Sequence, residues 1–586
     1  MKTTERSDLQ EAISLCKGSF IAAGFFSLFI NFLMLVPALY MLQLYDRVIT
    51  SGSESTLLML TMIMVVLFIT MGSLEWVRSQ LLVRVSARLE TLLNDRLFGA
   101  TFKQALFNGS AGSSQPLDDL TGLRQFLTGN GLFAFFDAPW LPIYIAVMFM
   151  FHQWYGWMAV GTVIILTILA IINEKSTSKT LKEANELAIK GRGLVNKNLR
   201  NAEVVDSMGM LDGIRERWKV GTTKVLYLQA KASSKAGAIT STSKTIRMMA
   251  QSLVLGLGGY LVLQQEISPG LMIAGSILLG RALAPIDLMI GSWKGFVAAR
   301  GQYHRLNEVL LKIPKDKEKM ALPAPVGQIN VDNVVIAPPG SRTPVVRGVS
   351  IDLAPGESLG VIGPSAAGKS TLARALLGIW PAMSGKVRLD GVDIFDWDRA
   401  EIGPYIGYLP QDIELFEGTI GENISRFGEM DPDKVVAAAK MADVHEMILG
   451  LPEGYDTIIG AIGGVLSGGQ RQRIGLARAI YGEPKFVLLD EPNSNLDDQG
   501  ELALARAITA LKQNKVTVII ITHRPGILGI LDKLLILKDG STVTFGPRDE
   551  VMQQLQQQAQ ANAAKNPQNV AKKPQTVAPV TVTPVI

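Results

Sequence analysis

The sequence predicts a multi-domain membrane protein, with a six-helix all-α transmembrane domain followed by an α/β P-loop nucleotide-binding domain. Three observations predict this fold class. Long apolar stretches recur between residues 19 and 291. After about residue 302 the sequence becomes more polar, and short β-rich runs alternate with helical ones. One of these runs leads directly into a glycine-rich phosphate-binding sequence at residues 363–371.

The six apolar stretches are each long enough to cross a bilayer, which takes about 20 mostly apolar residues in a helix. They lack the polar face that an amphipathic helix of a soluble protein shows. Spans are expected at about residues 19–44, 57–76, 131–151, 154–172, 248–265 and 270–291. Residues 1–18 are expected to form a cytoplasmic lead-in, with an amphipathic helix at 8–17 lying on the membrane surface.

Basic residues set the predicted orientation of the spans. The long loops after the second and fourth spans are rich in Lys and Arg, whereas the short turns between the other spans hold only Arg47. Basic loops stay on the cytoplasmic side. Both termini are therefore expected in the cytoplasm.

Apart from Glu75, which is next to the end of the second span, three charged residues fall within the predicted spans. Charge inside a membrane is costly, so Asp137, Arg281 and Asp287 could line a translocation path. Alternatively, these groups reach the interface from misplaced segment ends. Both alternatives stay open for Asp137 and Arg281, whereas Asp287, near a span end, favours the second.

Composition excludes several other classes of protein. A net charge of +5 spread over 586 residues does not indicate a nucleic-acid surface. The single cysteine, Cys16, excludes an internal disulfide and a cysteine-rich metal site. The domain 19–302 is expected to pass through a linker at 303–326 into the α/β domain at 327–551. The tail at 552–586 is too polar to bury a core and is expected to be disordered.

The phosphate loop is the strongest local motif. A predicted strand at 357–362 runs into GPSAAGKST, which matches G-x-x-x-x-G-K-[ST]. Its glycines let backbone N–H groups surround an anion, Lys369 reaches the β- and γ-phosphates, and Ser370 binds Mg²⁺. The predicted ATP-binding residues are Gly363, Pro364, Ser365, Ala366, Ala367, Gly368, Lys369, Ser370 and Thr371.

Two further motifs follow the loop. A second apolar run ends in Asp490 and Glu491, where Asp490 would hold Mg²⁺ and Glu491 would act as general base on the attacking water. The sequence LSGGQ precedes a helical pattern and offers free backbone N–H groups, as a second anion site or simply as a capped turn. Its residues are Leu466, Ser467, Gly468, Gly469 and Gln470.

These motifs, with SNLD at residues 494–497, resemble ATP-binding cassette (ABC) proteins. The resemblance implies that Gln411 senses Mg²⁺ and the attacking water, and that His523 contacts the γ-phosphate. The implied catalytic residues are Glu491, His523 and Gln411, and the implied Mg²⁺-binding residues are Ser370, Asp490 and Gln411. The resemblance also implies a homodimer, in which LSGGQ of one copy closes on the ATP bound by the other.

The chain departs from the family pattern in two places. The family usually stacks adenine on an aromatic residue in its first cassette strand, but residues 334–339 read VVIAPP. We therefore expect looser selection of the base with unchanged phosphate recognition. Asn495 replaces a common alanine.

The membrane half resembles type I protein-secretion exporters, through YDRV at residues 45–48 and FFDAPWLPIY at 135–144. The likeness is to the subfamily that exports proteases, lipases and haem-binding proteins. It implies an ATP-driven exporter in the bacterial inner membrane that moves unfolded polypeptides with a C-terminal signal. The implied partners are a periplasmic adaptor and an outer-membrane channel. With about eighteen residues before the first span, leader-peptide cleavage is not expected.

Two other functions remain open. One is export of lipids or small hydrophobic molecules, and the other is a membrane-tethered regulator without transport. The complete set of hydrolytic residues argues against the regulator. The resemblance also implies short coupling helices in the two inner loops, with candidates at residues 117–126 and 210–218.

Overall fold

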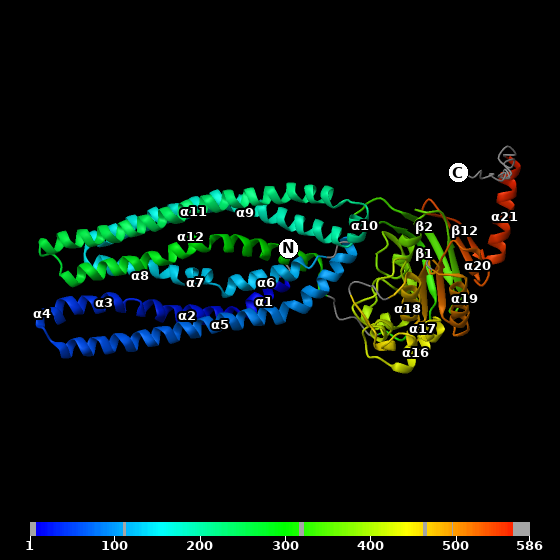
Figure 1. Ribbon diagram of the computed structural model, residues 1–586, viewed down its shortest axis with the longest axis horizontal. Helices are drawn as coiled ribbons and strands as arrows, with labels where there is room; N and C mark the ends of the chain where they lie inside the picture. Colours follow the sequence, from blue (N-terminus) through cyan, green and yellow to red (C-terminus); the bar gives the residue numbers. More distant parts are fainter. Residues whose placement is uncertain (1–6, 109–112, 316–321, 461–465, 495, 566–586) are drawn as a thin grey trace, which may run out of the picture. The chain divides into compact units, whose positions relative to one another are not determined.

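The structure is a computed structural model that describes residues 7–108, 113–315, 322–460, 466–494 and 496–565. Contacts divide the chain into two compact units, Met1–Lys315 and Asp316–Ile586. Among the described residues the first unit is helical and the second is mixed α/β (Figure 1). Six helical segments are long and apolar enough to cross a membrane. The predicted fold class is confirmed.

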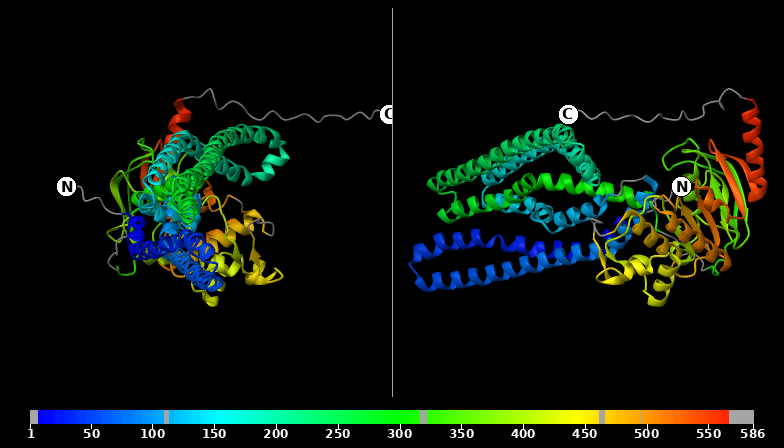
Figure 2. Two further views of the ribbon diagram at one scale, coloured as in Figure 1. Left: turned by 90° about the vertical axis from the view of Figure 1, so that its left-hand side faces the viewer. Right: turned by 45° about the vertical axis from the view of Figure 1, so that its right-hand side comes forward.

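The first unit consists of long helices that lie side by side, as two views show (Figures 1 and 2). Its helices are α1 (Asp8–Leu15), α2 (Lys17–Leu33), α3 (Val36–Gln43), α4 (Ile49–Ser51), α5 (Glu54–Asn108), α6 (Gln115–Thr128), α7 (Asn130–Asp137), α8 (Leu141–Phe151), α9 (Gln153–Leu199), α10 (Ala202–Ser207), α11 (Leu211–Leu263) and α12 (Pro269–Lys312). The candidate spans are Lys17–Ser51, Glu54–Phe107, Gly131–Phe151, Gln153–Leu199, Leu211–Leu263 and Pro269–Lys312.

Four of these helices run well past the length that a bilayer needs, because the inner loops are themselves helix-forming sequence. α5 has 55 residues, α9 has 47, α11 has 53 and α12 has 44. The fifth span ends two residues earlier than expected, since Gln264 caps α11 and Gln265 takes a left-handed φ of 59°. α12 continues to Lys312, ten residues into the segment predicted as a linker.

A buried polar cluster joins the first three spans where the first and third are broken. The Asp137 carboxylate accepts a hydrogen bond from Asn31 at 2.7 Å and pairs with Arg78 at 3.2 Å. Arg78 also donates to Ser27 at 2.9 Å. Tyr144 donates at 2.8 Å to the backbone carbonyl of Asn31, which lost its helical partner because the N–H of Leu35 bonds Phe32 instead.

This cluster corrects the expectation for Asp137. The residue is 8% exposed and its carboxylate has a cationic partner inside the bundle, so it neither lines an open path nor reaches the interface. Asp287 likewise has partners within the chain, since it accepts from Ser243 at 2.7 Å and pairs with Arg247 at 3.0 Å, both on α11. Arg281 is exposed.

The lead-in helix α1 also differs from expectation. Its apolar residues Leu9 and Ala12, with Cys16 after it, are buried in a core shared with α5, α6 and α12. Asp8 binds Arg96 of α5 at 2.6 Å. The apolar face is therefore covered by protein rather than by a membrane surface, because α5 and α12 extend far enough to meet it.

The second unit contains two main sheets. Its strands are β1 (Ile329–Ile336), β2 (Val346–Leu353), β3 (Ser358–Ile362), β4 (Ser384–Leu389), β5 (Val392–Asp393), β6 (Ile406–Leu409), β7 (Gly418–Thr419), β8 (Ile458–Ile459), β9 (Phe486–Asp490), β10 (Thr517–Ile521), β11 (Lys533–Lys538) and β12 (Ser541–Pro547). The larger sheet has the order β12-β11-β3-β10-β9-β6, and β2-β1-β4-β5 form the other.

Helices complete the second unit. They are α13 (Lys369–Leu376), α14 (Arg399–Ile402), α15 (Ile420–Ile424), α16 (Pro432–Met441), α17 (His445–Leu449), α18 (Gly468–Ile480), α19 (Asp498–Gln513), α20 (Pro525–Leu528) and α21 (Arg548–Lys565). One face of the larger sheet packs against the smaller sheet together with α13. Strands β9 and β10 are buried along their whole length, which explains their unbroken apolar sequences. α21 reaches Lys565, inside the segment predicted to be disordered.

Candidate nucleotide site

Parallel strands bring the predicted catalytic groups to one edge of the larger sheet. β3, β10, β9 and β6 are neighbours and run parallel. The phosphate loop follows β3, His523 follows β10, Asp490 ends β9 and Gln411 follows β6. The carboxyl ends of parallel strands lie at the same edge, where ligands of open α/β sheets bind. Sequence neighbours of four different strands therefore become neighbours in space.

The backbone of the phosphate loop is shaped by special residues. Ala366 and Gly368 have positive φ, at 65° and 94°. A side chain at Gly363 would place its Cβ 2.2 Å from the carbonyl oxygen of Leu537. Because this contact is with backbone, it cannot be relieved by a rotamer change. The loop turns directly into α13, whose first N–H groups are free to bind an anion.

Lys369 bends back over its own loop. Its Nζ donates to the carbonyls of Gly363 at 2.7 Å and Pro364 at 3.2 Å. Only 7% of the residue is exposed, and burial lowers the pKa of its ammonium group. Asp490 and Glu491 oppose that shift through their charges. The Lys369 ammonium group therefore already lies at the loop where a phosphate anion would bind.

Four predicted residues form a connected chain across the sheet edge. Lys369 Nζ lies 2.9 Å from His523 Nε2, and His523 Nε2 lies 3.6 Å from a Glu491 carboxylate oxygen. Gln411 Nε2 donates to the other Glu491 oxygen at 3.1 Å. An ammonium group can only donate, so charged Lys369 donates to His523 Nε2. His523 thus stands between the lysine of the phosphate loop and the Glu491 carboxylate.

Asp490 and Ser370 fit the chemistry of a Mg²⁺ site. Asp490 is 4% exposed, and its carboxylate accepts a hydrogen bond from Ser370. Burial, followed by the charge of Glu491, raises the pKa of Asp490 to about 6. No group of three or more metal-binding side chains occurs among the described residues. Magnesium at nucleotide sites typically takes one or two carboxylates together with phosphate oxygens, so this sparse donor set is sufficient.

The LSGGQ residues are not brought to the phosphate loop of their own chain. Ser467 caps α18 and forms a capping box with Gln470, through hydrogen bonds of 3.3 and 2.7 Å. Within the described part of the chain, no hydrogen bond or ion pair joins residues 466–470 to residues 363–371. The capped turn is therefore present, and it is not bonded to the phosphate loop within the described residues.

Gln472 is a residue of the site that motif matching missed. It lies on α18 two residues after LSGGQ, is 2% exposed, and donates to the carbonyl of Pro492 and, at 3.5 Å, to that of Glu491. It thus ties the start of α18 to the turn that carries Glu491. The available signal was a glutamine on the apolar, buried face of a helix.

The segment that should stack adenine has no aromatic residue, as the sequence indicated. Pro338 and Pro339 are half-buried after β1. The same loop approaches the phosphate loop, since a Cβ on Gly368 would lie 3.1 to 3.5 Å from atoms of Val345 and Val346. Asn495, the other departure, lies outside the described residues.

The helix boundaries around the two coupling-helix candidates differ from the expected ones. Residues 117–126 belong to the slightly longer helix α6, which an ion pair between the buried Asp119 and the half-exposed Arg305 connects to α12 at 2.7 Å. Residues 210–218 contain the first turns of α11, and the short helix beside them is α10. The hydrophobic residues Met208 and Leu211 at this tip are 70% and 52% exposed.

Comparisons with known proteins match both units. The description "ABC transporter transmembrane region" fits residues 20–283, and "ABC transporter" fits residues 346–494. A type I secretion system ATP-binding protein, PrsD of Rhizobium meliloti, is 43% identical over 95% of this chain and 97% of its own length. The cyclolysin secretion/processing ATP-binding protein CyaB of Bordetella pertussis is 28% identical over 90% of this chain and 75% of its own.

Two further comparisons agree with these. The leukotoxin translocation ATP-binding protein LktB of Mannheimia haemolytica is 26% identical over 90% of this chain and 75% of its own length. A solved structure of a bacterial Atm1-family ABC exporter with ATP bound superposes with a TM-score of 0.79. It covers 96% of this chain and 100% of its own at 21% identity, which is a likeness of fold.

Proposed function

Because this chain belongs to the ABC transporter family and is a type I secretion exporter of polypeptides, we propose that it moves unfolded polypeptides with a C-terminal signal across the bacterial inner membrane. The observation that carries the proposal is the likeness to PrsD along nearly the whole chain, membrane unit included. The proposed substrates are proteins of the protease, lipase or haem-binding type.

Hydrolysis is assigned to the groups at the sheet edge. Backbone N–H groups of the phosphate loop and Lys369 bind the phosphates, which neutralises charge that develops during phosphoryl transfer. Glu491 accepts the proton of the attacking water, and Gln411, which donates to Glu491 at 3.1 Å, orients that carboxylate. His523 donates to the γ-phosphate once Lys369 has turned from the ring to the phosphates.

Asp490 and Ser370 would hold Mg²⁺, which supplies charge stabilisation to the phosphate oxygens. The aspartate suits this role because it is buried without a strong cationic partner. Its raised pKa shows that the isolated carboxylate is poorly stabilised. A bound divalent cation would remove that penalty.

We infer a homodimer from the position of LSGGQ. Ser467 and its neighbouring N–H groups form an anion site that has no contact with the phosphate loop of the same chain in the described residues. A second copy could present them to that loop. Movement then requires that ATP bind the closed pair of cassettes better than the open pair. A periplasmic adaptor and an outer-membrane channel would complete the path out of the cell.

The proposed function is tested by ATPase activity of the purified full chain in proteoliposomes. The probes are C-terminal segments of proteins encoded beside this chain, with N-terminal segments of the same proteins as controls. We expect at least one C-terminal segment to change the rate of hydrolysis in a saturable manner. Equal effects of both kinds of segment, or stimulation by lipid-like molecules alone, would contradict a C-terminal polypeptide signal.

A further inference from the structure

Arg281 differs from Asp137 and Asp287, the other charged residues well inside the predicted spans. Asp137 pairs with Arg78, and Asp287 pairs with Arg247. Arg281 has an exposed side chain and makes no hydrogen bond or ion pair within the described residues. An arginine stays charged under all ordinary conditions, so its charge cannot be relieved by deprotonation. It needs water or an anion from outside the chain.

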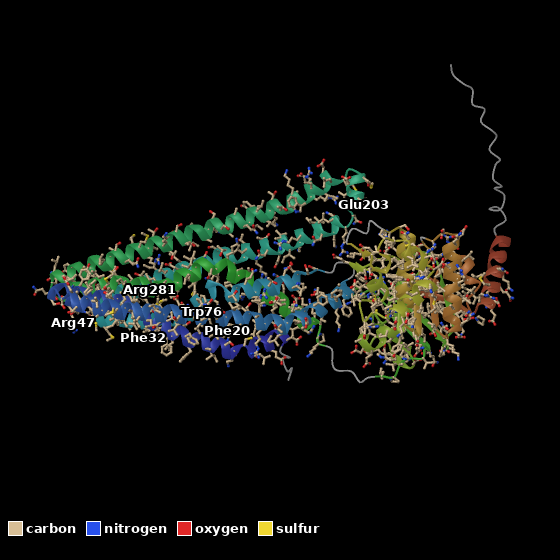
Figure 3. The ribbon with its side chains drawn as sticks, turned by 60° about the horizontal axis from the view of Figure 1, so that its bottom comes forward. Phe20, Phe32, Arg47, Trp76, Glu203 and Arg281 are labelled. Carbon is tan, nitrogen blue, oxygen red and sulfur yellow. The ribbon has the colours of Figure 1, made fainter. Side chains whose placement is uncertain are left out.

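The position of Arg281 along α12 places it deep in the membrane. α12 begins at Pro269, and 281 − 269 = 12 residues correspond to about 18 Å of helix. That is near the middle of a hydrocarbon layer of about 30 Å. Figure 3 shows Arg281 on the helical bundle between Arg47 and Glu203. A side chain at such a depth cannot easily reach either interface.

A second polar group occurs at the same level. Pro285 lies inside α12 and has no N–H to donate to the carbonyl four residues earlier, which is that of Arg281. Backbone groups left without a partner are tolerated in a membrane only where they are buried in protein or line a water-filled cavity. The guanidinium of Arg281, and its carbonyl that Pro285 cannot bond, are thus both polar groups that favour water or protein over lipid at this level.

The packing of α12 shows which face of the helix carries Arg281. α12 contacts α3, α6, α7, α8, α9 and α11, and half of its most apolar window is buried, the largest share among the candidate spans. Between residues 270 and 290 only Arg281 and Leu288 are exposed. They are seven residues apart and so share one face. The exposed face of α12 between residues 270 and 290 therefore carries Arg281, which has no hydrogen bond or ion pair among the described residues.

We propose that this face of α12 lines a water-filled path through the membrane domain, where Arg281 binds carboxylate groups of the transported polypeptide. Lipid would leave the guanidinium unsatisfied, whereas water satisfies it. An unfolded chain in transit would then exchange water for its own Asp and Glu side chains, because guanidinium groups bind carboxylates in two-point contacts. The binding half of the proposal rests on the proposed function, and the water-filled path does not.

Thiol labelling tests the path. The sequence has one cysteine, so Cys16→Ser supplies a background without thiols, to be checked for unchanged ATPase activity. Arg281→Cys is compared with Val66→Cys. Val66 also lies twelve residues from the start of its helix and is 60% exposed. The most apolar window of that span has no buried residue, so Val66 serves as a position that faces lipid. The probe is a membrane-impermeant anionic methanethiosulfonate, which needs water to react, applied in proteoliposomes with and without ATP.

The expected result is modification of the residue 281 thiol at least about tenfold faster than that at residue 66. Leu288→Cys, which keeps the arginine in place, should also react, since it shares the open face. Equal rates at residues 66, 281 and 288 under both conditions would overturn the path. Leu288→Cys keeps Arg281 in place. Its labelling rate therefore tests the water-filled path even if the Arg281→Cys protein folds poorly.

The binding half is tested with a C-terminal segment that stimulates ATP hydrolysis, and with the same segment after its Asp and Glu are changed to Asn and Gln. Arg281→Gln should raise the half-stimulating concentration of the acidic segment about tenfold and leave that of the amide segment unchanged. Arg281→Lys should retain most of the difference between the half-stimulating concentrations of the acidic and the amide segments. An equal shift for both segments would overturn carboxylate binding. Fast labelling without stimulation by any segment would count against the proposed function alone.

Discussion

At the scale of single residues, the turn that carries Glu491 is the most constrained part of the site. Glu491 has a positive φ of 49°, and its N–H donates to the carbonyl of Ile521 at 2.9 Å. Left-handed backbone at a residue other than glycine costs about 1–3 kcal/mol and persists where surroundings impose it. The turn therefore directs the carboxylate between Gln411 and His523.

Substitution Glu491→Gln should abolish most hydrolysis while keeping ATP binding. The amide preserves the shape and the hydrogen-bonding capacity of the side chain but cannot accept a proton from water. General-base catalysis contributes about 10²–10⁴-fold, so we expect a loss of at least about 100-fold in kcat. Steady-state ATPase assays and fluorescent-nucleotide binding measure the two properties.

Glu483→Gln, a change at an exposed position of the same domain, serves as the control and should retain full activity. Hydrolysis by the Glu491→Gln protein at the wild-type rate would remove Glu491 from the catalytic role. Parallel loss of binding and hydrolysis would point to a structural role of the turn.

Asp490 predicts a pH dependence of Mg²⁺-assisted ATP binding. Its pKa is raised to about 6, so the folded domain holds a proton that an unfolded chain releases near pH 3.8. This group therefore stabilises the fold more at low pH, and the contribution is lost as pH rises through 4 to 6. Mg²⁺ needs the ionised form. We expect the Mg²⁺-dependent gain in ATP affinity to weaken about tenfold between pH 7 and pH 5.

Titration calorimetry with and without Mg²⁺ gives this quantity, and Asp490→Asn is the matched control because ATP itself binds protons in this range. The control should lack the pH-dependent difference. A Mg²⁺ effect that stays constant from pH 7 to pH 5 in the wild-type protein would exclude Asp490 as the titrating ligand.

At the scale of elements, two helices of the cassette begin with the same capping box. Ser467 caps α18 with Gln470, and Thr419 caps α15 with Glu422. Loss of an N-cap side chain costs about 1 kcal/mol in either case. The two caps are thus equivalent for helix stability, while only the first belongs to the proposed anion site.

Ser467→Ala and Thr419→Ala should therefore separate stability from function. We expect both to lower the free energy of unfolding of the cassette by about 1 kcal/mol. Only Ser467→Ala should reduce ATP hydrolysis strongly, because the proposed dimer would also use its hydroxyl at the phosphates of ATP bound by the second copy. Thermal melting and ATPase assays measure both effects. Equal losses of activity would show that α18 has a capping serine and no further role for it.

At the scale of the whole molecule, the proposed homodimer combines the phosphate loop of one copy with LSGGQ of the other. Mixing a Lys369→Ala chain with a Ser467→Ala chain should then restore one intact site per heterodimer. We expect hydrolysis well above that of either homodimer, measured on heterodimers purified through two different affinity tags.

The matched control pairs a wild-type chain with a chain that carries both substitutions. That heterodimer holds the same mutations, but each of its two sites then lacks one essential group, so it should be inactive. Higher activity of the control than of the first mixture would mean that each site is complete within one chain.

Much of the fold and site could be predicted from the sequence because the signals are local. Apolar stretches of spanning length indicate six spans, and the loop ending in Lys369 and Ser370 defines the phosphate site within nine residues. The acidic pair Asp490 and Glu491, at the end of β9, is likewise a signal from adjacent residues. Gln411 and His523 were also predicted as catalytic residues, although that prediction rested on the resemblance to ABC proteins rather than on residue spacing.

By itself, the sequence determined which stretches are long and apolar enough to cross a membrane and which short motif predicts a phosphate site, since both follow from residues adjacent in the chain. Tertiary structure alone decided the partners of groups far apart in sequence. It joined Asp137 to Arg78 across 59 positions and Lys369 to His523 across 154, buried α1 against protein, and gave Arg281 no hydrogen bond or ion pair within the part of the chain that the structure describes. The physical reason is that burial and charge pairing depend on how helices and strands pack, which no local pattern of residues encodes.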